Sequence, residues 1–326
     1  MERLFELSAV DMAGVDALIR ARLASDVPLI PALGEHLVEA GGKRLRPLLT
    51  VAAARLCGGG GEGACKLAAA VEFIHTATLL HDDVVDGSKL RRGKVAAHLI
   101  WGGAASVLVG DFLFARAFEL MVETGRLQAL NILARASRII AEGEVLQLTR
   151  AHDLELDQGT YLEIIRGKTA ELFAAAAEAG AVVAGGSAAQ VKALAAYGLQ
   201  LGLAFQLTDD ALDYGGASET LGKNAGDDFR EGKVTLPLLL AIRRCGARET
   251  EFWRRAVGAP PADGEQSDAD FRRARDLIAG TGALSDTLAL AQDYADAAKA
   301  ELRIFASGEW RASLEALADF AVERTA

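Results

Sequence analysis

An apolar run that ends in three aspartates, FIHTATLLHDDVVD, occupies residues 73–86 and indicates the fold class of this chain. A second run of the same form, LQLGLAFQLTDDALD, occupies residues 199–213. Residues three and four apart share one face of an α-helix, so each run predicts a helix whose end projects several carboxylates in one direction. We therefore expect long helices as the scaffold of the molecule.

The two aspartate clusters also predict a chemistry. Like charges one helical turn apart repel each other, and a divalent cation between them removes that cost. Magnesium takes one or two carboxylates and completes its coordination shell with water and substrate phosphates. The pair of clusters therefore predicts two metal platforms that face one diphosphate-bearing cavity.

The composition favours an all-α protein. Of the 326 residues, 51% are apolar and only 6% are aromatic, so the core must consist mainly of alanine, leucine and valine. That mixture favours helices, and the sequence contains no convincing strand. Three capping boxes predict helix starts, at Ser8 with Asp11, Thr160 with Glu163, and Ser187 with Gln190. No long linker interrupts the chain, so we predict a single domain over residues 1–326.

Charge and cysteine content exclude several classes of protein. The formal net charge of −10 argues against a nucleic-acid partner, which calls for a basic face. Three cysteines without a CxxC pair fit a reducing cytosol. The acidic residues Glu2, Glu6 and Asp11 make the first segment unlike a signal peptide. No uncharged apolar stretch reaches about 18 residues, so we expect no membrane span.

Basic residues accompany the acidic clusters. They occur in GGKRLRP at residues 41–47, RRG at 91–93, GKT at 167–169, GK at 222–223 and GKVT at 232–235. Arginine matches phosphate oxygens with two parallel donors, whereas lysine acts as a movable point charge. In an acidic protein, cations beside acidic clusters indicate ligands that bring negative charge with them.

Each motif alone has an ordinary structural interpretation. A single DDxxD is more often a solvated helix end than a metal site, and Lys-Arg pairs usually serve solubility. GKT falls short of a P-loop. His75 taken alone is more simply a core histidine with satisfied hydrogen bonds. The conjunction of two clusters, each followed by basic residues, favours a binding site.

The ordered set of motifs resembles the trans-isoprenyl diphosphate synthases, or polyprenyl synthetases. GGKRLRP, HDDVVD followed by RRG, RGKTAELF, FQLTDDALDY and EGKVTLPL occur in the order and at the spacing of that family, strongly from about Gly41 to Lys233. The resemblance implies the isoprenoid synthase fold, which is a single large helical bundle around a central cavity. It also implies a homodimer.

The resemblance assigns roles by motif position. It implies that Asp82 and Asp86 bind two magnesium ions with support from Asp83, and that Asp209 binds a third near Asp210 and Asp213. The implied ligands of isopentenyl diphosphate are Lys43, Arg46, His75 and Arg92. The implied contacts of the allylic diphosphate are Arg91, Lys168, Thr169, Gln206, Lys223 and Lys233.

The implied reaction is a head-to-tail 1'-4 condensation. Metals and cations draw charge from the allylic diphosphate until its C–O bond ionises, which is electrostatic and Lewis-acid catalysis. The double bond of isopentenyl diphosphate attacks the allylic cation, and loss of a proton restores an alkene. Water must be kept from the cation, so we expect an apolar cavity beneath the metals.

Product length in this family depends on the helix beneath the first cluster. Ala77 and Thr78 are small where short-chain synthases place an aromatic floor, and Ile74 and Val71 beyond them are not large plugs. We therefore predict a long-chain product of about eight to ten isoprene units (C40–C50), the side-chain precursor of a quinone such as ubiquinone. A floor from another helix is the alternative, and the candidates there are Phe112, Phe114 and Phe118.

Other functions fit less well. A short-chain farnesyl or geranylgeranyl diphosphate synthase is the main alternative. A terpene cyclase would normally carry a different metal-binding motif in place of the second DDxxD. A non-catalytic partner subunit would have lost aspartates from the clusters. A purely structural bundle would leave the motifs unexplained. We expect a cytoplasmic enzyme with at most transient membrane contact for product release. The last residues, Glu323-Arg324-Thr325-Ala326, leave open whether this segment closes over the site.

Overall fold

The computed structural model describes residues 1–39, 42–91, 93–215, 226–259 and 268–324. By their contacts these residues group into two compact units. Unit 1 comprises residues 1–138, 172–199 and 298–317, and unit 2 comprises residues 139–171, 200–297 and 318–326. The prediction of a single domain over residues 1–326 stays a prediction.

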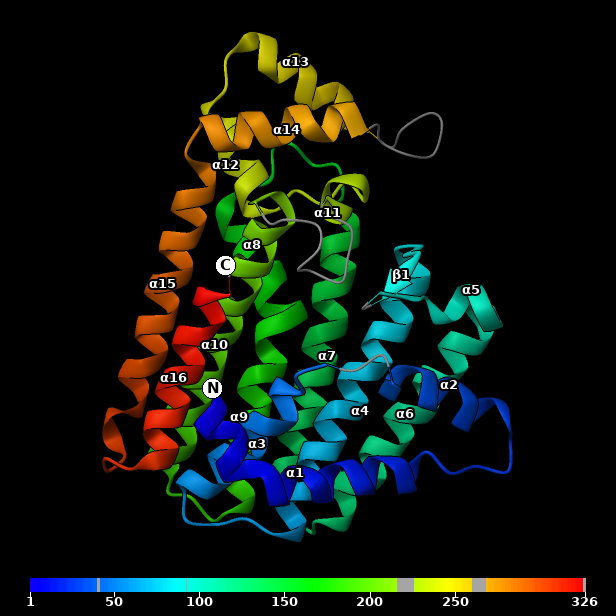
Figure 1. Ribbon diagram of the computed structural model, residues 1–326, viewed down its shortest axis with the longest axis vertical. Coiled ribbons are helices and arrows are strands. Elements are labelled where there is room, and N and C mark those ends of the chain that lie inside the picture. The colour runs from blue at the N-terminus through cyan, green and yellow to red at the C-terminus, as the bar shows by residue number, and fades with distance from the viewer. Residues whose placement is uncertain (40–41, 92, 216–225, 260–267, 325–326) are drawn as a thin grey trace. The chain divides into compact units, whose positions relative to one another are not determined.

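Unit 1 is built around helix α4. Its elements are α1 (Glu2–Arg22), α2 (Leu29–Glu39), α3 (Leu45–Leu56), α4 (Glu62–Val85), β1 (Leu90–Arg91), β2 (Lys94–Val95), α5 (Ala97–Trp101) and α6 (Gly103–Glu123). The first part of α7 (Leu127–Thr149), most of α9 (Glu171–Val183), the start of α10 (Ala188–Gly215) and the 3₁₀ turn η2 (Leu302–Ile304) also belong to it. Helix α4 packs against α1, α3 and α6 (Figure 1).

Unit 2 holds the remaining elements. They are the second part of α7, α8 (Gln158–Ile165), the π-helical turn η1 (Arg166–Ala170), the rest of α10, α11 (Asp227–Arg230), α12 (Leu236–Arg244), α13 (Ala247–Ala256) and α14 (Asp268–Gly280). Most of α15 (Ala283–Glu301) and the end of α16 (Glu309–Glu323) complete it. Helix α12 contacts α8, α13 and α14 (Figure 1).

Helix α4 shows why the apolar run at its C-terminal end forms a core helix. Its buried residues lie on several faces and include Leu67, Val71, Phe73 and Ile74. A helix that is apolar on most faces belongs inside a protein or a membrane. By length and composition α4 could span a bilayer, but 56% of its most apolar window is buried inside the protein. We therefore interpret it as a core helix.

Small residues let neighbouring helices approach closely. A Cβ added to Gly180 of α9 would lie 2.3 Å from the carbonyl oxygen of Thr50 in α3, which is closer than side chains come to backbone. Helix α9 is also rich in alanine, with residues 174–177 all alanine and all buried. The alanine-rich composition thus builds a tight helical core, as the sequence predicts.

The helix starts test the three capping boxes. At the start of α10 the backbone N–H of Ser187 donates to Gln190 Oε1 at 2.9 Å, and that of Gln190 donates to Ser187 Oγ at 3.3 Å, so this box is confirmed. The other two predictions are wrong. Ser8 lies inside α1, where its hydroxyl donates to the Leu4 carbonyl, and Asp157 rather than Thr160 caps α8.

The expectation that no strand forms also needs a correction. Two strands of two residues each, β1 and β2, pair antiparallel directly after the first aspartate cluster. Such short strands carry no alternation that a sequence pattern could reveal. The hairpin places Arg91 where it can reach back to α4.

Candidate active site

The first aspartate cluster occupies the last turn of α4. The backbone N–H of Asp86 donates to the Asp82 carbonyl at 2.8 Å, so the two side chains stand one helical turn apart, and both are half-buried. Asp83 differs from them, because only 2% of its side chain is exposed. The cluster therefore divides into two accessible carboxylates and one buried carboxylate.

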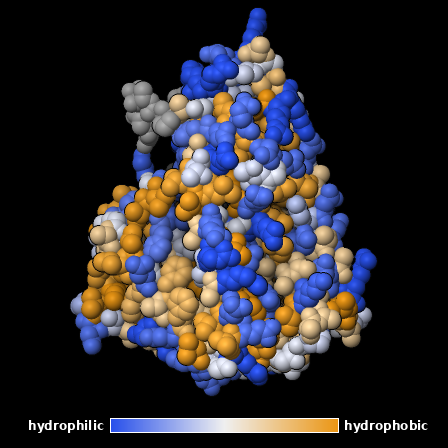
Figure 2. Space-filling view, turned by 180° about the vertical axis from the view of Figure 1, so that it is seen from behind, coloured by the Kyte–Doolittle hydropathy of each residue, from blue (hydrophilic) through white to orange (hydrophobic). Residues whose placement is uncertain are grey.

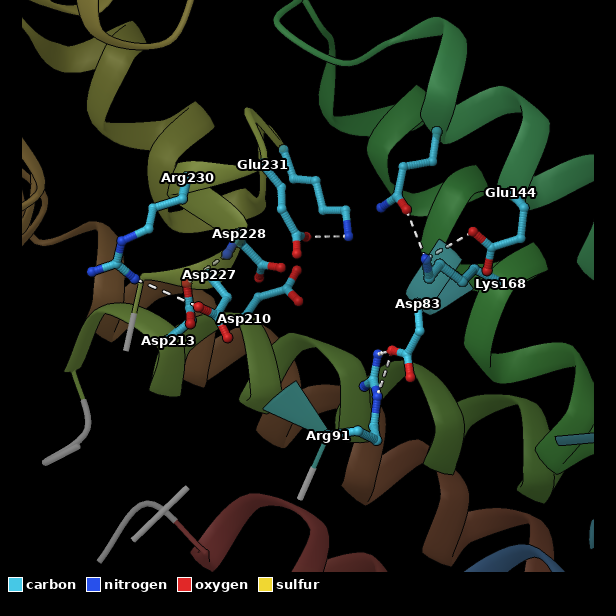
Figure 3. Close-up of polar contacts among 12 residues, drawn as sticks. Asp83, Arg91, Glu144, Lys168, Asp210, Asp213, Asp227, Asp228, Arg230 and Glu231 are labelled. Carbon is cyan, nitrogen blue, oxygen red and sulfur yellow. Dashed lines mark hydrogen bonds and ion pairs between the residues drawn. The ribbon is translucent and has the colours of Figure 1, made fainter. Parts of the chain in front are cut away.

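Arg91 pairs with the buried carboxylate. Its Nε and Nη2 both donate to Asp83 Oδ1, the first at 2.8 Å (Figure 3). Burial opposes the charge of Arg91, but the hydrogen bonds to Asp83 and the charges of Asp82 and Asp86 outweigh it and raise the pKa of Arg91. The negative charges of all three aspartates thus stabilise the charged form of Arg91, which lies on the hairpin that follows them.

Two of the predicted isopentenyl diphosphate ligands, Arg46 of α3 and His75 of α4, are in contact. Arg46 Nη1 lies 3.1 Å from His75 Nε2, and its guanidinium carbon lies 4.4 Å from the centre of the Phe173 ring. Because arginine can only donate, His75 accepts this bond through Nε2. Lys43 is exposed in the segment before α3. Arg92 lies outside the described residues.

The second aspartate cluster ends a helix in unit 2. Asp210 is buried and accepts two hydrogen bonds, from the Tyr161 hydroxyl at 2.5 Å and from Gln206 Nε2 at 2.7 Å. Gln206 in turn accepts from the Thr169 hydroxyl at 2.7 Å. Thr169, Gln206 and Asp210 therefore form one relay of hydrogen bonds anchored by Tyr161.

The burial of Asp210 changes its acidity. Loss of solvent and the nearby charge of Asp228 raise the pKa of Asp210 to about 8, against the lowering effect of the Tyr161 and Gln206 hydrogen bonds. Asp209 beside it remains half-exposed. Burial again separates adjacent aspartates into a buried and an accessible one.

Asp213 holds a neighbouring loop. Its two carboxylate oxygens accept from the backbone N–H groups of Gly226 at 3.0 Å and Asp228 at 3.3 Å. These bonds fix the start of α11, whose sequence together with Glu231 reads DDFRE, the same spacing of acidic residues as in the two predicted clusters. Figure 3 shows Asp213, Asp227 and Asp228 close together. Sequence reasoning missed this third acidic group, although its spacing was a usable signal.

Two lysines of unit 2 are paired with glutamates. Lys233 Nζ donates to Glu231 Oε2 at 2.5 Å. Lys168 Nζ donates to Glu144 Oε2 and to Gln147 Oε1, both at 2.8 Å (Figure 3). Both lysines are predicted phosphate ligands, and each is paired with a glutamate carboxylate in the structure. Lys223 lies outside the described residues.

The position of Lys168 depends on close helix packing. It lies in the π-helical turn η1, a distortion that is frequent at functional sites. A Cβ added to Gly143 of α7 would lie 2.7 Å from the Lys168 backbone nitrogen, so only glycine permits this approach. The glycine therefore brings Lys168 to Glu144 and Gln147, two contacts that the sequence did not suggest.

The donor set fits magnesium. Among the described residues, no three histidine, cysteine, aspartate or glutamate side chains come together as a ready-made metal cage. The carboxylates that are only partly buried are those of Asp82 and Asp86 at the end of α4, and that of Asp209 near the end of α10. Magnesium needs only one or two carboxylates when phosphates complete its shell, so each cluster by itself offers enough carboxylates for such an ion.

The predicted chain-length residues lie inside unit 1. Ile74 and Ala77 are fully buried, and the hydroxyl of the half-buried Thr78 donates to the His75 carbonyl at 2.8 Å. Of the alternative plugs, Phe118 is 42% exposed and therefore faces solvent. Phe112 lies beneath Arg116, and Phe114 stacks on His81, with ring centroids 6.1 Å apart.

The chain matches one family model over most of its length and several known proteins over nearly all of it. The family model for polyprenyl synthetase matches residues 27–273. The octaprenyl diphosphate synthase of Escherichia coli is 45% identical over 326 residues, which cover 99% of each chain.

Solved structures agree with this match. A polyprenyl synthase from Caulobacter crescentus, crystallised with calcium and isoprenyl diphosphate, is 72% identical with a TM-score of 0.96, over 100% of this chain and 98% of the other. A decaprenyl diphosphate synthase from Rhodobacter capsulatus is 51% identical with a TM-score of 0.93, over 100% and 99%. These structures confirm the predicted all-α fold.

Proposed function

This chain belongs to the polyprenyl synthetase family, and on that premise we propose that it is a long-chain all-trans polyprenyl diphosphate synthase. Its substrates are isopentenyl diphosphate and an allylic diphosphate primer, and its product is the octaprenyl to decaprenyl precursor of a quinone side chain. The observation that carries the proposal is the full-length similarity to octaprenyl and decaprenyl synthases, at 45% and 51% identity. Both aspartate clusters are intact in this chain.

We assign the metals to the accessible carboxylates. Asp82 and Asp86 would hold two magnesium ions, and Asp209 would hold the third. Bound magnesium supplies the Lewis acidity that neutralises charge on the departing diphosphate. Asp83 and Asp210 are buried and act instead by fixing their neighbours, Arg91 for the first and Gln206 for the second.

The basic residues bind and orient the two diphosphates. Arg46, with Lys43, His75 and Arg92, binds isopentenyl diphosphate, and the contact of Arg46 with His75 and the Phe173 ring pre-orients its guanidinium. Arg91, Lys168, Thr169, Gln206, Lys223 and Lys233 bind the allylic diphosphate. Glu144 and Glu231 pair with two of these lysines until a diphosphate takes their place.

The apolar side chains beneath α4's aspartates exclude water from the allylic cation. Ile74 and Ala77 form part of that lining and leave room for a growing chain, because neither position holds an aromatic ring. The departing diphosphate is the base that takes the proton after condensation. No side chain of the protein forms a covalent bond in this scheme.

The active species is a homodimer in the cytoplasm. Support comes from an apolar stripe on α6, in which Leu108, Ala115, Phe118 and Val122 are all exposed and recur at helical spacing. Apolar side chains also reach the surface among hydrophilic ones in the face that Figure 2 shows. Membrane contact is transient and serves release of the hydrophobic product.

Product analysis tests the function. Purified protein is incubated with magnesium, farnesyl diphosphate and labelled isopentenyl diphosphate, and the chain length of the product is measured. Products of about eight to ten units support the proposal. Products of three or four units would make it a short-chain synthase, and no elongation would favour a non-catalytic partner subunit.

A further inference from the structure

Arg324, directly after α16, reaches the second aspartate cluster. Its Nη1 lies 2.8 Å from Asp209 Oδ1, and its Nη2 donates to the Phe205 carbonyl at 2.7 Å. Its Nε donates to the Ala321 carbonyl at 3.0 Å. The contacts with Asp209 and Phe205 join the guanidinium to α10, and the contact with Ala321 joins it to α16, all within unit 2.

The Phe205 ring adds a fourth contact. The guanidinium carbon of Arg324 lies 3.6 Å from the centre of that ring, a close cation–π distance. The Arg324 side chain is only 16% exposed, whereas that of Asp209 is 40% exposed. Arg324 is therefore a packed group that holds an accessible carboxylate, and not a solvated surface charge.

We propose that Arg324 competes with the metal ion for the Asp209 carboxylate. The residue that follows α16 then occupies the position of the third cation until substrate and metal bind together. The inference rests on the proposed role of Asp209 as a metal ligand. A cation that binds Asp209 must break or share the ion pair with Arg324, because the guanidinium and a metal ion both need the Asp209 carboxylate. The guanidinium of Arg324 and a metal ion bound to the same carboxylate would also repel each other, because both are positively charged.

The competition has two consequences. Without metal, Arg324 neutralises Asp209 and tethers α16 to α10. With metal, that tether is weakened and the guanidinium becomes available to anions. Arg324 is thus a positioning residue that couples loading of the second cluster to the end of α16.

The test measures binding of Mn²⁺ in the presence of inorganic pyrophosphate, by calorimetry, on the full chain. The variants are Arg324→Gln, Asp209→Asn and the double variant. Arg311→Gln is the matched control, because Arg311 lies on α16 and likewise pairs with a carboxylate, Glu315, at 2.9 Å. Arg324→Lys keeps the charge.

Competition predicts tighter binding when Arg324 is removed. Arg324→Gln should bind Mn²⁺ about fivefold more tightly than the unmodified chain, the upper range for an accessible ion pair. Arg324→Lys should show a smaller change and Arg311→Gln none. The gain should vanish in the Asp209→Asn background. Unchanged or weaker binding in Arg324→Gln, with Asp209→Asn still impaired, would overturn the competition.

Failure of the premise gives a different result. If Asp209→Asn binds Mn²⁺ and pyrophosphate as the unmodified chain does, Asp209 is not a metal ligand, and both the assignment and the competition fall. A second readout is the melting temperature. Competition predicts that Arg324→Gln is destabilised mainly without metal, whereas a purely structural contact predicts the same loss with and without metal.

Discussion

Asp83 accepts two hydrogen bonds from Arg91 on one carboxylate oxygen, although only 2% of the Asp83 side chain is exposed. The Arg91 side chain is 15% exposed, so both charges of the pair are largely removed from water. A buried pair of this kind is not in itself a source of stability, but losing one partner leaves an uncompensated charge. The pair therefore constrains the hairpin that carries Arg91.

Asp83→Leu should destabilise the protein strongly. The expected loss in the free energy of unfolding is about 3–5 kcal/mol, since Arg91 would remain buried without its anion. Unfolding in urea, followed by circular dichroism, measures it. The double variant Asp83→Leu with Arg91→Met should recover most of the loss, and a double variant as unstable as the single one would contradict this account.

Ala77→Phe should shorten the product. Ala77 is fully buried five residues before Asp82, so an aromatic ring there should block the growing chain after a few condensations. Ile74 lies three residues further from the aspartates, about 4.5 Å along the helix. Ile74→Phe should therefore stop elongation later than Ala77→Phe. Thin-layer chromatography of the dephosphorylated products measures both lengths, and identical product lengths in the two variants and the unmodified chain would refute the tunnel.

Patterns among neighbouring residues were enough to predict where the helices that carry the site residues end. The aspartate runs ended helices as predicted, and the box at Ser187 and Gln190 capped α10, because each signal involves neighbours in the chain. The cap at Ser8 failed since the residues before it also favour a helix, and α1 begins at Glu2.

Contacts between distant segments could not be read from the sequence. Tyr161 meets Asp210, and Arg324 meets Asp209, only because separate helices pack side by side. The π-helical turn at Lys168 depends on the close approach of Gly143, a residue 25 positions earlier. Each of these contacts decides which distant residue a predicted site residue pairs with. Periodicity within one segment of the sequence cannot reveal that partner.

Glu144→Gln should strengthen binding of the allylic substrate. The change keeps a hydrogen-bond acceptor for Lys168 but removes the anion that pairs with it, and in the proposed function a diphosphate replaces that anion. We expect KM for the allylic diphosphate to fall by about twofold to fivefold with little change in stability, because both side chains are partly exposed. Glu142→Gln, at an exposed position on the same helix, is the control. An unchanged KM in Glu144→Gln would show that this pair does not restrain Lys168.

Leu108→Glu should weaken the proposed homodimer. Leu108 is 67% exposed at the start of the apolar stripe on α6, and a second copy of the chain would bury a carboxylate there without a partner. We expect the dimer dissociation constant to rise by roughly tenfold or more, since an unpaired buried charge costs more than about 1.4 kcal/mol. Sedimentation velocity over a range of protein concentrations measures the constant. Val10→Glu serves as the control, because Val10 on α1 is 86% exposed and lies outside the stripe. Equal dissociation constants for Leu108→Glu and the unmodified chain would place the interface on another surface.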